Sequence, residues 1–228
     1  PMDLSAIIAG FYARAGIVYL NNGETGSVTF IGTVSPAGGN LKEPVTESTK
    51  KAARCFYALS QNRADSKRYP AIDTLDSYSK YLEYPEFIDY SKEKLDENWV
   101  GLVNEARNVL VRGKETEEQI NILGDDSVPI DYHVTLWKSE FVDFVILQQD
   151  AFDKIDATTS LERQEYMLKK VINVTRSEFK FEGFEEVAIY FKRLINVFRQ
   201  MNYTVFKSEE FHKVEEEANA VLEERIIK

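Results

Sequence analysis

The 228-residue chain is long enough to bury roughly 70% of the surface that its unfolded form exposes, and to hold one large domain or two small ones. Its 43% hydrophobic content, with only 11 Gly and 6 Pro, excludes fibrous and disordered classes, and its many helix formers favour a mainly helical fold. A formal net charge of -10 repels phosphate backbones and so argues against nucleic-acid binding.

The single cysteine, Cys55, excludes an internal disulfide and fits a reducing compartment. The two histidines, His133 and His212, lack metal-ligand spacing to the cysteine or to each other, so we predict no metal site. No run approaches the ~18 apolar residues that cross a bilayer. We therefore expect no direct membrane insertion, and any membrane association must come through partner proteins.

The first part of the chain is expected to contain two helices and one strand. Apolar residues at helical spacing predict a helix over residues 3–15, which Gly16 would end. Residues 27–34 are β-branched and apolar over too short a span for a helix, which predicts a strand covered on both faces, although few other strands are available to pair with it. A second helix is predicted over residues 46–59.

The rest of the chain is expected to be helical. Weak periodicity over residues 77–96 predicts short helices and loops, and an apolar face predicts a helix from Trp99 that Gly113 would end. Further helices are predicted over residues 115–122, around 134–145, and over 160–174, 181–201 and 208–227, of which 181–201 has the clearest apolar stripe. The predicted fold class is mainly α, with a C-terminal helical bundle preceded by a segment with few strands.

A search for the phosphate-binding motif G-x-x-x-x-G-K-[ST] finds only Gly113 with Lys114. Glu115 follows where the motif needs a hydroxyl residue, and Asn108 stands where its first glycine belongs. The sequence therefore contains no phosphate-binding loop of this kind.

Three separated segments occur in one order, and together they are more specific than any one alone. They are residues 26–46, with Gly-Ser-Val-Thr, Ser-Pro-Ala-Gly-Gly and Glu-Pro-Val-Thr; residues 69–79, Tyr-Pro-Ala-Ile-Asp-Thr-Leu-Asp-Ser-Tyr-Ser; and residues 147–153, Leu-Gln-Gln-Asp-Ala-Phe-Asp. In this order they resemble the catalytic A subunits of V-type and A-type rotary ATPases, and the resemblance extends over essentially the whole chain.

The resemblance implies two domains: residues 1–75 as the C-terminal remnant of an α/β, RecA-like nucleotide-binding domain, and residues 76–228 as the C-terminal helical domain. The family's P-loop, catalytic glutamate and metal-site residues would lie upstream of Pro1. The intact parent would use ATP or ADP with Mg and would couple ATP hydrolysis or synthesis to proton or sodium transport through rotation of a central stalk. The chain alone is expected to carry no catalytic residue, to bind no nucleotide tightly and to be inactive.

Tyr69 and Phe152 match the family positions whose rings hold the adenine. An aromatic pair suits this task because a purine has flat π-faces, and stacking contributes ~1 to 3 kcal/mol per base. Two rings supply only ~2 to 6 kcal/mol, whereas even a millimolar complex needs ~4 kcal/mol net of ordering costs. Nucleotide binding without the phosphate cradle should therefore be weak or absent. From the residues alone, an ordinary buried aromatic is the alternative for each ring.

Gly124, Asp125, Asp126 and Asp131 occupy the position of the family's acidic loop between two helices, which contacts the central rotor. Pushing a rotor requires a rigid protruding helix pair more than any particular side chain, because packed contacts transmit the torque. The loop is less acidic than its F-type counterpart, which weakens a charge-based contact. A solvated turn with aspartates near a helix N-terminus is the alternative.

Pro36, Gly38 and Gly39 lie in a loop that the family places near the subunit interface, with a plain surface turn as the alternative. The partners implied are the B subunits of an alternating ring of A and B subunits, and the subunits of the central rotor stalk, with no nucleic acid. The resemblance also implies a cytoplasmic location, peripheral to the membrane, in the soluble sector of the complex.

A second hypothesis belongs to a different class of protein, a stand-alone acidic helical adaptor that binds protein partners without nucleotide chemistry. The composition and the bundle periodicity are equally compatible with it. Tyr69 and Phe152 discriminate between the two, because only an adenine pocket requires their rings to share one site.

Overall fold

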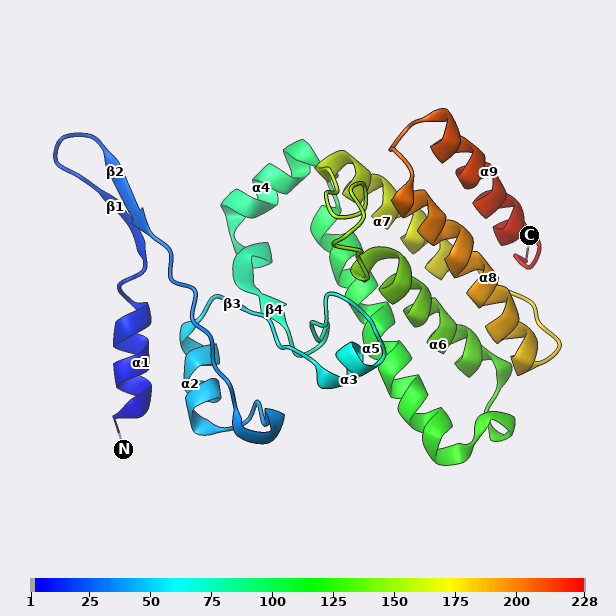
Figure 1. Ribbon diagram of the computed structural model, residues 1–228, viewed down its shortest axis with the longest axis horizontal. Coiled ribbons are helices and arrows are strands. Elements are labelled where there is room, and N and C mark those ends of the chain that lie inside the picture. The colour runs from blue at the N-terminus through cyan, green and yellow to red at the C-terminus, as the bar shows by residue number, and fades with distance from the viewer. Residues whose placement is uncertain (1–2, 228) are drawn as a thin grey trace. The chain divides into compact units, whose positions relative to one another are not determined.

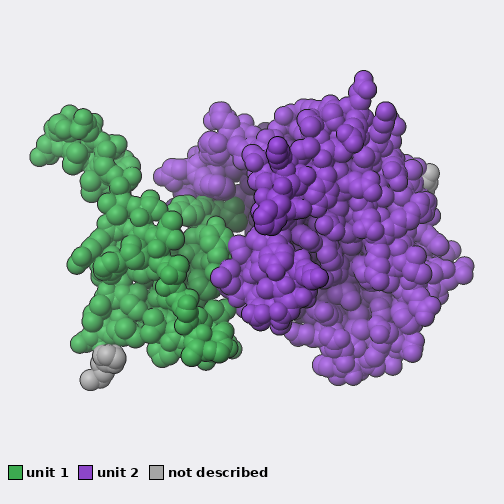
Figure 2. Space-filling view, viewed as in Figure 1, with its two compact units in different colours: residues 1–57, 77–83 green, residues 58–76, 84–228 purple. Residues whose placement is uncertain are grey.

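Helices dominate the computed structural model, which describes residues 3–227 (Figure 1). Within these residues the strands form two small two-stranded sheets, so the predicted mainly α class is confirmed. The chain divides into two compact units, residues 1–57 with 77–83, and residues 58–76 with 84–228 (Figure 2). The division into domains at residue 75 stays a prediction, and its first two residues lie outside the described part of the chain.

Unit 1 consists of short elements. Its helix α2 starts sharply because the Glu43 carboxylate accepts hydrogen bonds from the backbone N–H groups of Val45 and Thr46, while Pro44 needs no N–H partner at the first helical position. The elements are α1 (Leu4–Tyr12), β1 (Gly16–Tyr19), β2 (Thr25–Val28), η1 (Ala37–Gly39), α2 (Pro44–Ala52), β3 (Cys55–Phe56), β4 (Tyr78–Ser79) and η2 (Lys80–Glu83).

The strand predicted over residues 27–34 is wrong in extent, in pairing and in burial. The strand ends at Val28, pairs antiparallel with β1 in a hairpin, and is largely exposed instead of covered on both faces. Just beyond it, Phe30 packs against α1: its ring lies edge-on to the rings of Phe11 and Tyr12, with centroids 4.9 and 4.7 Å away. Side-chain packing on a helix thus replaces the expected strand pairing.

The helix predicted over residues 46–59 also ends early, at Ala52. The chain becomes extended at Ala53, and Cys55–Phe56 pair with Tyr78–Ser79. The Tyr78 hydroxyl donates a hydrogen bond to the Lys50 carbonyl in the last turn of α2. A partner more than twenty residues away in sequence therefore ends this helix, which a local apolar pattern does not indicate.

Unit 2 is a helical bundle. The predicted stripe over residues 181–201 lies in its core, where Val187, Phe191, Leu194, Phe198 and Met201 are fully buried. The elements are α3 (Gln61–Asp65), α4 (Pro85–Lys94), α5 (Trp99–Leu123), η3 (Asp125–Ser127), α6 (Ile130–Val142), the π-helical turn η4 (Asp143–Leu147), α7 (Leu161–Arg176), α8 (Phe184–Tyr203) and α9 (Glu209–Glu223).

Gly113 does not end a helix, contrary to the prediction, and residues 115–122 do not form a helix of their own. Helix α5 runs without interruption over 25 residues and ends before Gly124, whose φ of 87° favours glycine. Gly113 is buried where α5 packs on α6: a Cβ added there would lie 2.1 Å from the Cβ of Ser139. The glycine lets two helices approach closely. No helix in residues 3–227 is both long enough and apolar enough to span a membrane.

Candidate functional site

The loop that carries Tyr69 is closed by its own backbone. The Ser60 N–H donates to the Ala71 carbonyl at 2.8 Å, and the Asp73 N–H donates to the Ala58 carbonyl at 2.7 Å. The Tyr69–Pro70 peptide bond is cis, and the Tyr69 side chain is 52% exposed. The loop therefore presents the tyrosine ring to solvent, and a buried aromatic is excluded here.

Aspartates organise the segment that carries Phe152. The Asp156 carboxylate accepts the Asp150 N–H at 2.6 Å, and Asp150 in turn accepts the Phe152 N–H at 2.9 Å. Burial raises the pKa of Asp156, while the hydrogen bond from Asp150 and the charge of Arg163 act in the opposite direction. The Phe152 side chain is 99% exposed at the tip of this turn, so it too is no buried aromatic.

The Tyr69 loop and the Phe152 segment are joined by one backbone hydrogen bond. The Gln149 N–H donates to the Tyr69 carbonyl at 2.8 Å, across 80 residues of sequence. The Gln149 side chain donates to the Asp156 carbonyl at 2.6 Å. Both exposed aromatic residues thus stand on backbone segments that are fixed to each other, as a shared binding platform requires.

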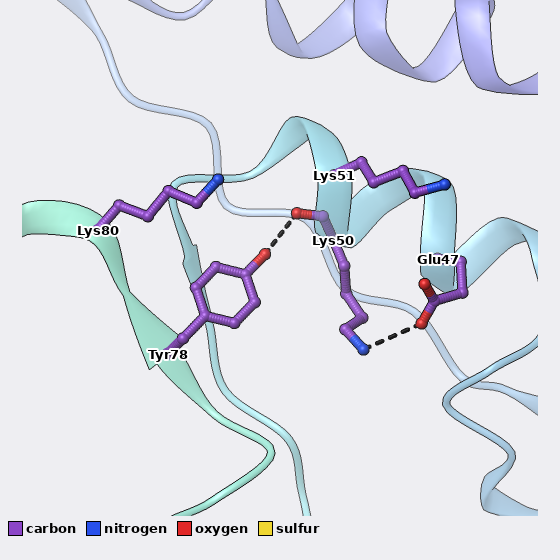
Figure 3. A pocket seen from close by; sticks show the side chains of 5 residues that line it. All are labelled: Glu47, Lys50, Lys51, Tyr78 and Lys80. Atoms are coloured by element: carbon purple, nitrogen blue, oxygen red, sulfur yellow. Dashed lines mark hydrogen bonds and ion pairs between the residues drawn. The ribbon is translucent and has the colours of Figure 1, made fainter.

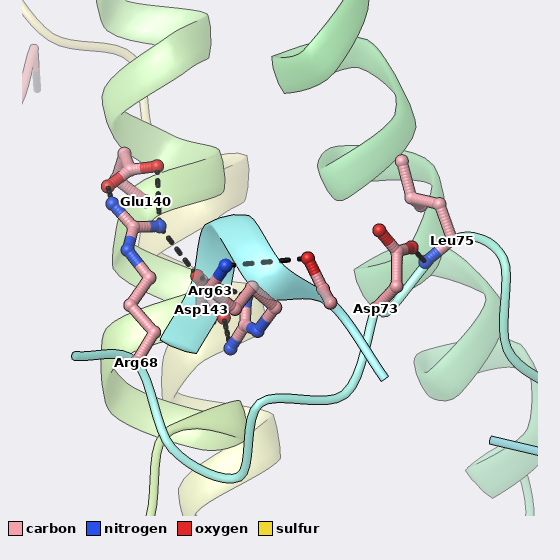
Figure 4. A network of polar contacts seen from close by, with 7 residues as sticks. Arg63, Arg68, Asp73, Leu75, Glu140 and Asp143 are labelled. Carbon is pink, nitrogen blue, oxygen red and sulfur yellow. Dashed lines mark hydrogen bonds and ion pairs between the residues drawn. The ribbon is translucent and has the colours of Figure 1, made fainter. Parts of the chain in front are cut away.

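A cluster of two arginines and two carboxylates links the segment before Tyr69 to Glu140 and Asp143 (Figure 4). Arg63 donates to both carboxylate oxygens of Asp143, each at 2.9 Å. Arg68 donates to both oxygens of Glu140, at 3.1 and 2.6 Å, and also to Asp143 at 2.7 Å. Asp143 is only 5% exposed, so these hydrogen bonds replace the water that would surround an exposed carboxylate.

The environment of Arg68 favours its charged form. Burial alone would lower its pKa, but the hydrogen bonds and charges of Glu140 and Asp143 outweigh that effect and raise the pKa above its usual value. The guanidinium also lies 4.6 Å from the centroid of the Phe144 ring. Because Arg68 directly precedes Tyr69, this anchored group fixes the start of the exposed part of the loop.

The predicted rotor-contact residues lie at the end of the α5–α6 pair. Gly124, Asp125 and Asp126 form the exposed turn that includes η3, and Asp131 lies exposed in the first turn of α6. The turn is held by His133, whose Nε2 lies 3.1 Å from the Asp125 carbonyl. Its ring is buried and stacks on Phe184 of α8 at 5.0 Å.

Sequence reasoning overlooked two apolar residues at this tip. Ile122 is 81% exposed and Leu123 is 58% exposed in the last turn of α5. Exposed apolar side chains next to each other are typical of a surface that another molecule covers. Their position directly before Gly124, the glycine that follows the helix, was the sequence signal that could have indicated their exposure.

The remaining predicted site residues belong to unit 1. Gly38 and Gly39 are exposed in η1 and have positive φ angles of 62° and 71°, and the Gly39 N–H donates to the Pro36 carbonyl at 3.1 Å. A side chain at either glycine would strain this turn. The loop therefore has a defined shape at the surface, as either an interface or a plain turn would.

A shallow hollow of about 310 Å³ in unit 1 is lined by charged and polar side chains, some of which already bind one another (Figure 3). Lys50 pairs with Glu47 at 3.0 Å, and Tyr78 donates to the Lys50 backbone carbonyl. Lys51 and Lys80 complete its lining. Within residues 3–227 no group of His, Cys, Asp and Glu side chains is arranged to hold a metal ion.

The arginine–carboxylate cluster was also overlooked. Its partners are 72 to 80 residues apart in sequence, so no local pattern joins them. The available signals were two arginines shortly before the Tyr69 motif and two acids three residues apart, Glu140 and Asp143, near the end of a predicted helix.

Two family models match the chain. The nucleotide-binding domain of the ATP synthase alpha/beta family matches residues 1–79, and the C-terminal domain of V and A type ATP synthase matches residues 88–182. A V-type ATP synthase alpha chain from Borrelia duttonii is 43% identical over 94% of this chain. Another, from Treponema denticola, is 39% identical over 95%.

The chain spans about a third of the length of these relatives, 35% and 34% respectively. A solved structure of the ATP synthase subunit NeqB from Nanoarcheaum equitans is similar over 78% of this chain and 41% of the NeqB chain, with a TM-score of 0.55. At 22% sequence identity this last likeness bears on the fold alone.

Proposed function

The chain belongs to the family of V-type and A-type ATP synthase alpha chains, and on this premise we propose that it is a C-terminal portion of the catalytic A subunit of a rotary ATPase. The parent subunit would hydrolyse or make ATP with Mg and couple that reaction to proton or sodium transport by turning a central stalk. This chain would supply the adenine side of the nucleotide site and the helices that face the rotor.

One observation supports the adenine role above the others: the hydrogen bond from the Gln149 N–H to the Tyr69 carbonyl joins the two segments that bear Tyr69 and Phe152. Both rings are exposed and free to stack on a flat base. A helical adaptor without nucleotide chemistry does not require this arrangement, and family membership removes the main reason to consider one.

The chain by itself is expected to be catalytically silent. The sequence contains no phosphate-binding loop of the Walker type, and two aromatic platforms supply only ~2 to 6 kcal/mol before ordering costs. The measurement is phosphate release from Mg-ATP by the purified chain, with the full-length subunit in its complex as positive control. Turnover that follows the purified chain through successive columns would contradict the proposal.

Unit 1 fits the last part of a nucleotide-binding domain. Ile17, Val18 and Tyr19 of β1 and Ile31 beyond β2 are all exposed. So many exposed large apolar side chains in one small unit are unusual on a self-sufficient domain. We propose that the rest of the parent nucleotide-binding domain covers it, and that the domain boundary lies near residue 75.

The tip of the α5–α6 pair would contact the rotor through apolar packing more than through charge. Ile122 and Leu123 each have apolar surface to bury, worth ~1.5 to 3 kcal/mol for a complete side chain. The exposed carboxylates of Asp125 and Asp126 would contribute little, because exposed ion pairs are typically worth ~0 to 1 kcal/mol. His133 anchors the turn to the bundle, which makes the tip stiff enough to push.

Replacing Ile122 and Leu123 together by serine is expected to reduce coupling in the assembled complex while ATP hydrolysis continues, because torque requires packed contact. The measurement is the ratio of ions transported to ATP hydrolysed. Ile189→Ser is the matched control, since Ile189 is also an exposed apolar residue but lies on a different helix, α8. A larger loss of coupling from Asp125→Asn with Asp126→Asn than from the serine pair would favour a charge-based contact instead.

The same proposal names the partners. The loop with Pro36, Gly38 and Gly39 would face the B subunits of the alternating ring, and the tip would face the central stalk. The chain would then be cytoplasmic and peripheral to the membrane, within the soluble sector of the complex. Its formal net charge of -10 fits protein partners better than nucleic acid.

A further inference from the structure

We propose that Arg63 and Arg68 are positioning residues that hold the Tyr69 loop and the Phe152 segment in one fixed arrangement for the nucleotide base. The inference rests on the proposed adenine role of these two rings. Neither arginine is expected to touch the nucleotide. Both act through Asp143 and Glu140, which lie where α6 passes into the π-helical turn η4.

The contacts connect Tyr69 to Gln149 by two separate routes. Arg68 is the covalent neighbour of Tyr69 and binds Asp143, the first residue of η4. The π-helical turn leads through Gln148, whose N–H donates to the Asp143 carbonyl at 2.8 Å, to Gln149. Gln149 then donates its N–H back to the Tyr69 carbonyl. The two sides of the proposed platform are thus tied together twice, once by side chains and once by backbone.

The geometry requires guanidinium groups and not merely positive charge. Arg63 reaches both oxygens of Asp143, and Arg68 reaches both oxygens of Glu140, so each arginine makes a planar two-point contact. A lysine has a single ammonium group and cannot reproduce this fork. Arg63 also accepts, through its backbone carbonyl, the Arg68 N–H at 2.8 Å, which couples the two arginines within the loop.

The test uses the full-length subunit in its assembled complex, with Arg63→Lys and Arg68→Lys made separately. For Arg68→Lys we expect the KM for ATP to rise about tenfold, a change of about 1.4 kcal/mol, with kcat little altered. In a Tyr69→Ala background the same substitution should raise the KM by much less than it does alone, because part of its effect acts through Tyr69. Hydrogen exchange of the Gln149 amide should become at least about tenfold faster.

The matched control is Arg176→Lys. Arg176 makes a similar two-atom contact with Glu105, at 2.7 and 2.6 Å, on the exposed surface of the bundle. In the Arg176→Lys variant, the KM for ATP and the hydrogen-exchange rate of the Gln149 amide should equal those of the unmodified subunit. Glu140→Gln keeps the side-chain shape but removes its charge, so it should repeat the effect of Arg68→Lys. It therefore provides a second test if an arginine variant fails to assemble.

The outcomes separate this inference from the function on which it rests. If Arg68→Lys leaves Gln149 exchange unchanged, or if its effect on KM is fully additive with that of Tyr69→Ala, the positioning role is refuted. If Tyr69→Ala itself leaves the KM for ATP unchanged while Arg68→Lys still accelerates Gln149 exchange, the arginines hold the two segments together as proposed and it is the adenine role that fails.

Discussion

Gly113→Ala is expected to lower the free energy of unfolding of unit 2 by about 2 kcal/mol. The added Cβ would lie 2.1 Å from the Ser139 Cβ and 2.2 Å from its Oγ, far inside contact distance. Overpacking at the upper end of its usual range costs about 3 kcal/mol, and the better helix propensity of alanine returns about 1 kcal/mol. The midpoint of thermal unfolding should fall by about 4 to 8 °C.

Two variants separate close packing from a general effect of glycine in a helix. At Gly101, also in α5, an added Cβ would meet the end of the Asn98 side chain, which can rotate away. Gly101→Ala should therefore be neutral or slightly stabilising. Ser139→Gly, combined with Gly113→Ala, should restore much of the lost free energy of unfolding, because it removes the opposing Cβ. A Gly113→Ala variant as stable as the parent chain would show that α5 and α6 can separate without cost.

Replacing Tyr69 or Phe152 by alanine in the full-length subunit is expected to raise the KM for ATP roughly 5- to 150-fold. This range follows from ~1 to 3 kcal/mol for each base–aromatic contact, at a factor of about ten for each 1.4 kcal/mol. Turnover at saturating ATP should change little, because the base is bound equally before and during the reaction. The measurement is steady-state ATP hydrolysis by the assembled complex.

Ring-preserving variants are the controls for this second result. Tyr69→Phe and Phe152→Tyr keep a flat π-face and should retain a KM near that of the unmodified subunit. Inhibition by Mg-tripolyphosphate, which has no base, should be the same in the alanine variants and in the unmodified subunit. Equal weakening of ATP and tripolyphosphate binding would mean that the alanine variants disturb the phosphate side, and the adenine role would then be wrong.

The bundle was largely predictable because its helices carry their own signal. The stripe over residues 181–201 repeats apolar residues every three or four positions, and the structure buries them as expected. The two aromatic positions were found through a motif, and the structure adds the hydrogen bond that joins their segments. Whether their rings hold adenine stays a prediction.

The errors share one cause, which is that a contact distant in sequence overrode a local pattern. Residues 29–34 have strand-like composition, yet Phe30 packs on α1 and the strand ends at Val28. Gly113 looks like a helix terminator, yet it is the close-approach point for Ser139. The sequence alone cannot distinguish a glycine that ends a helix from one that lets a second helix approach.

The amino-acid order by itself determined the helical class, the family and the absence of a Walker-type phosphate loop within these 228 residues, because periodicity and motifs are properties of neighbouring residues. The tertiary structure alone decided that Arg63 and Arg68 meet Asp143 and Glu140, and that Ile122 and Leu123 stay uncovered at the tip of a helix pair. Buried ion pairs and exposed apolar residues both depend on which segments the fold brings together, so they become visible only once the helices are packed.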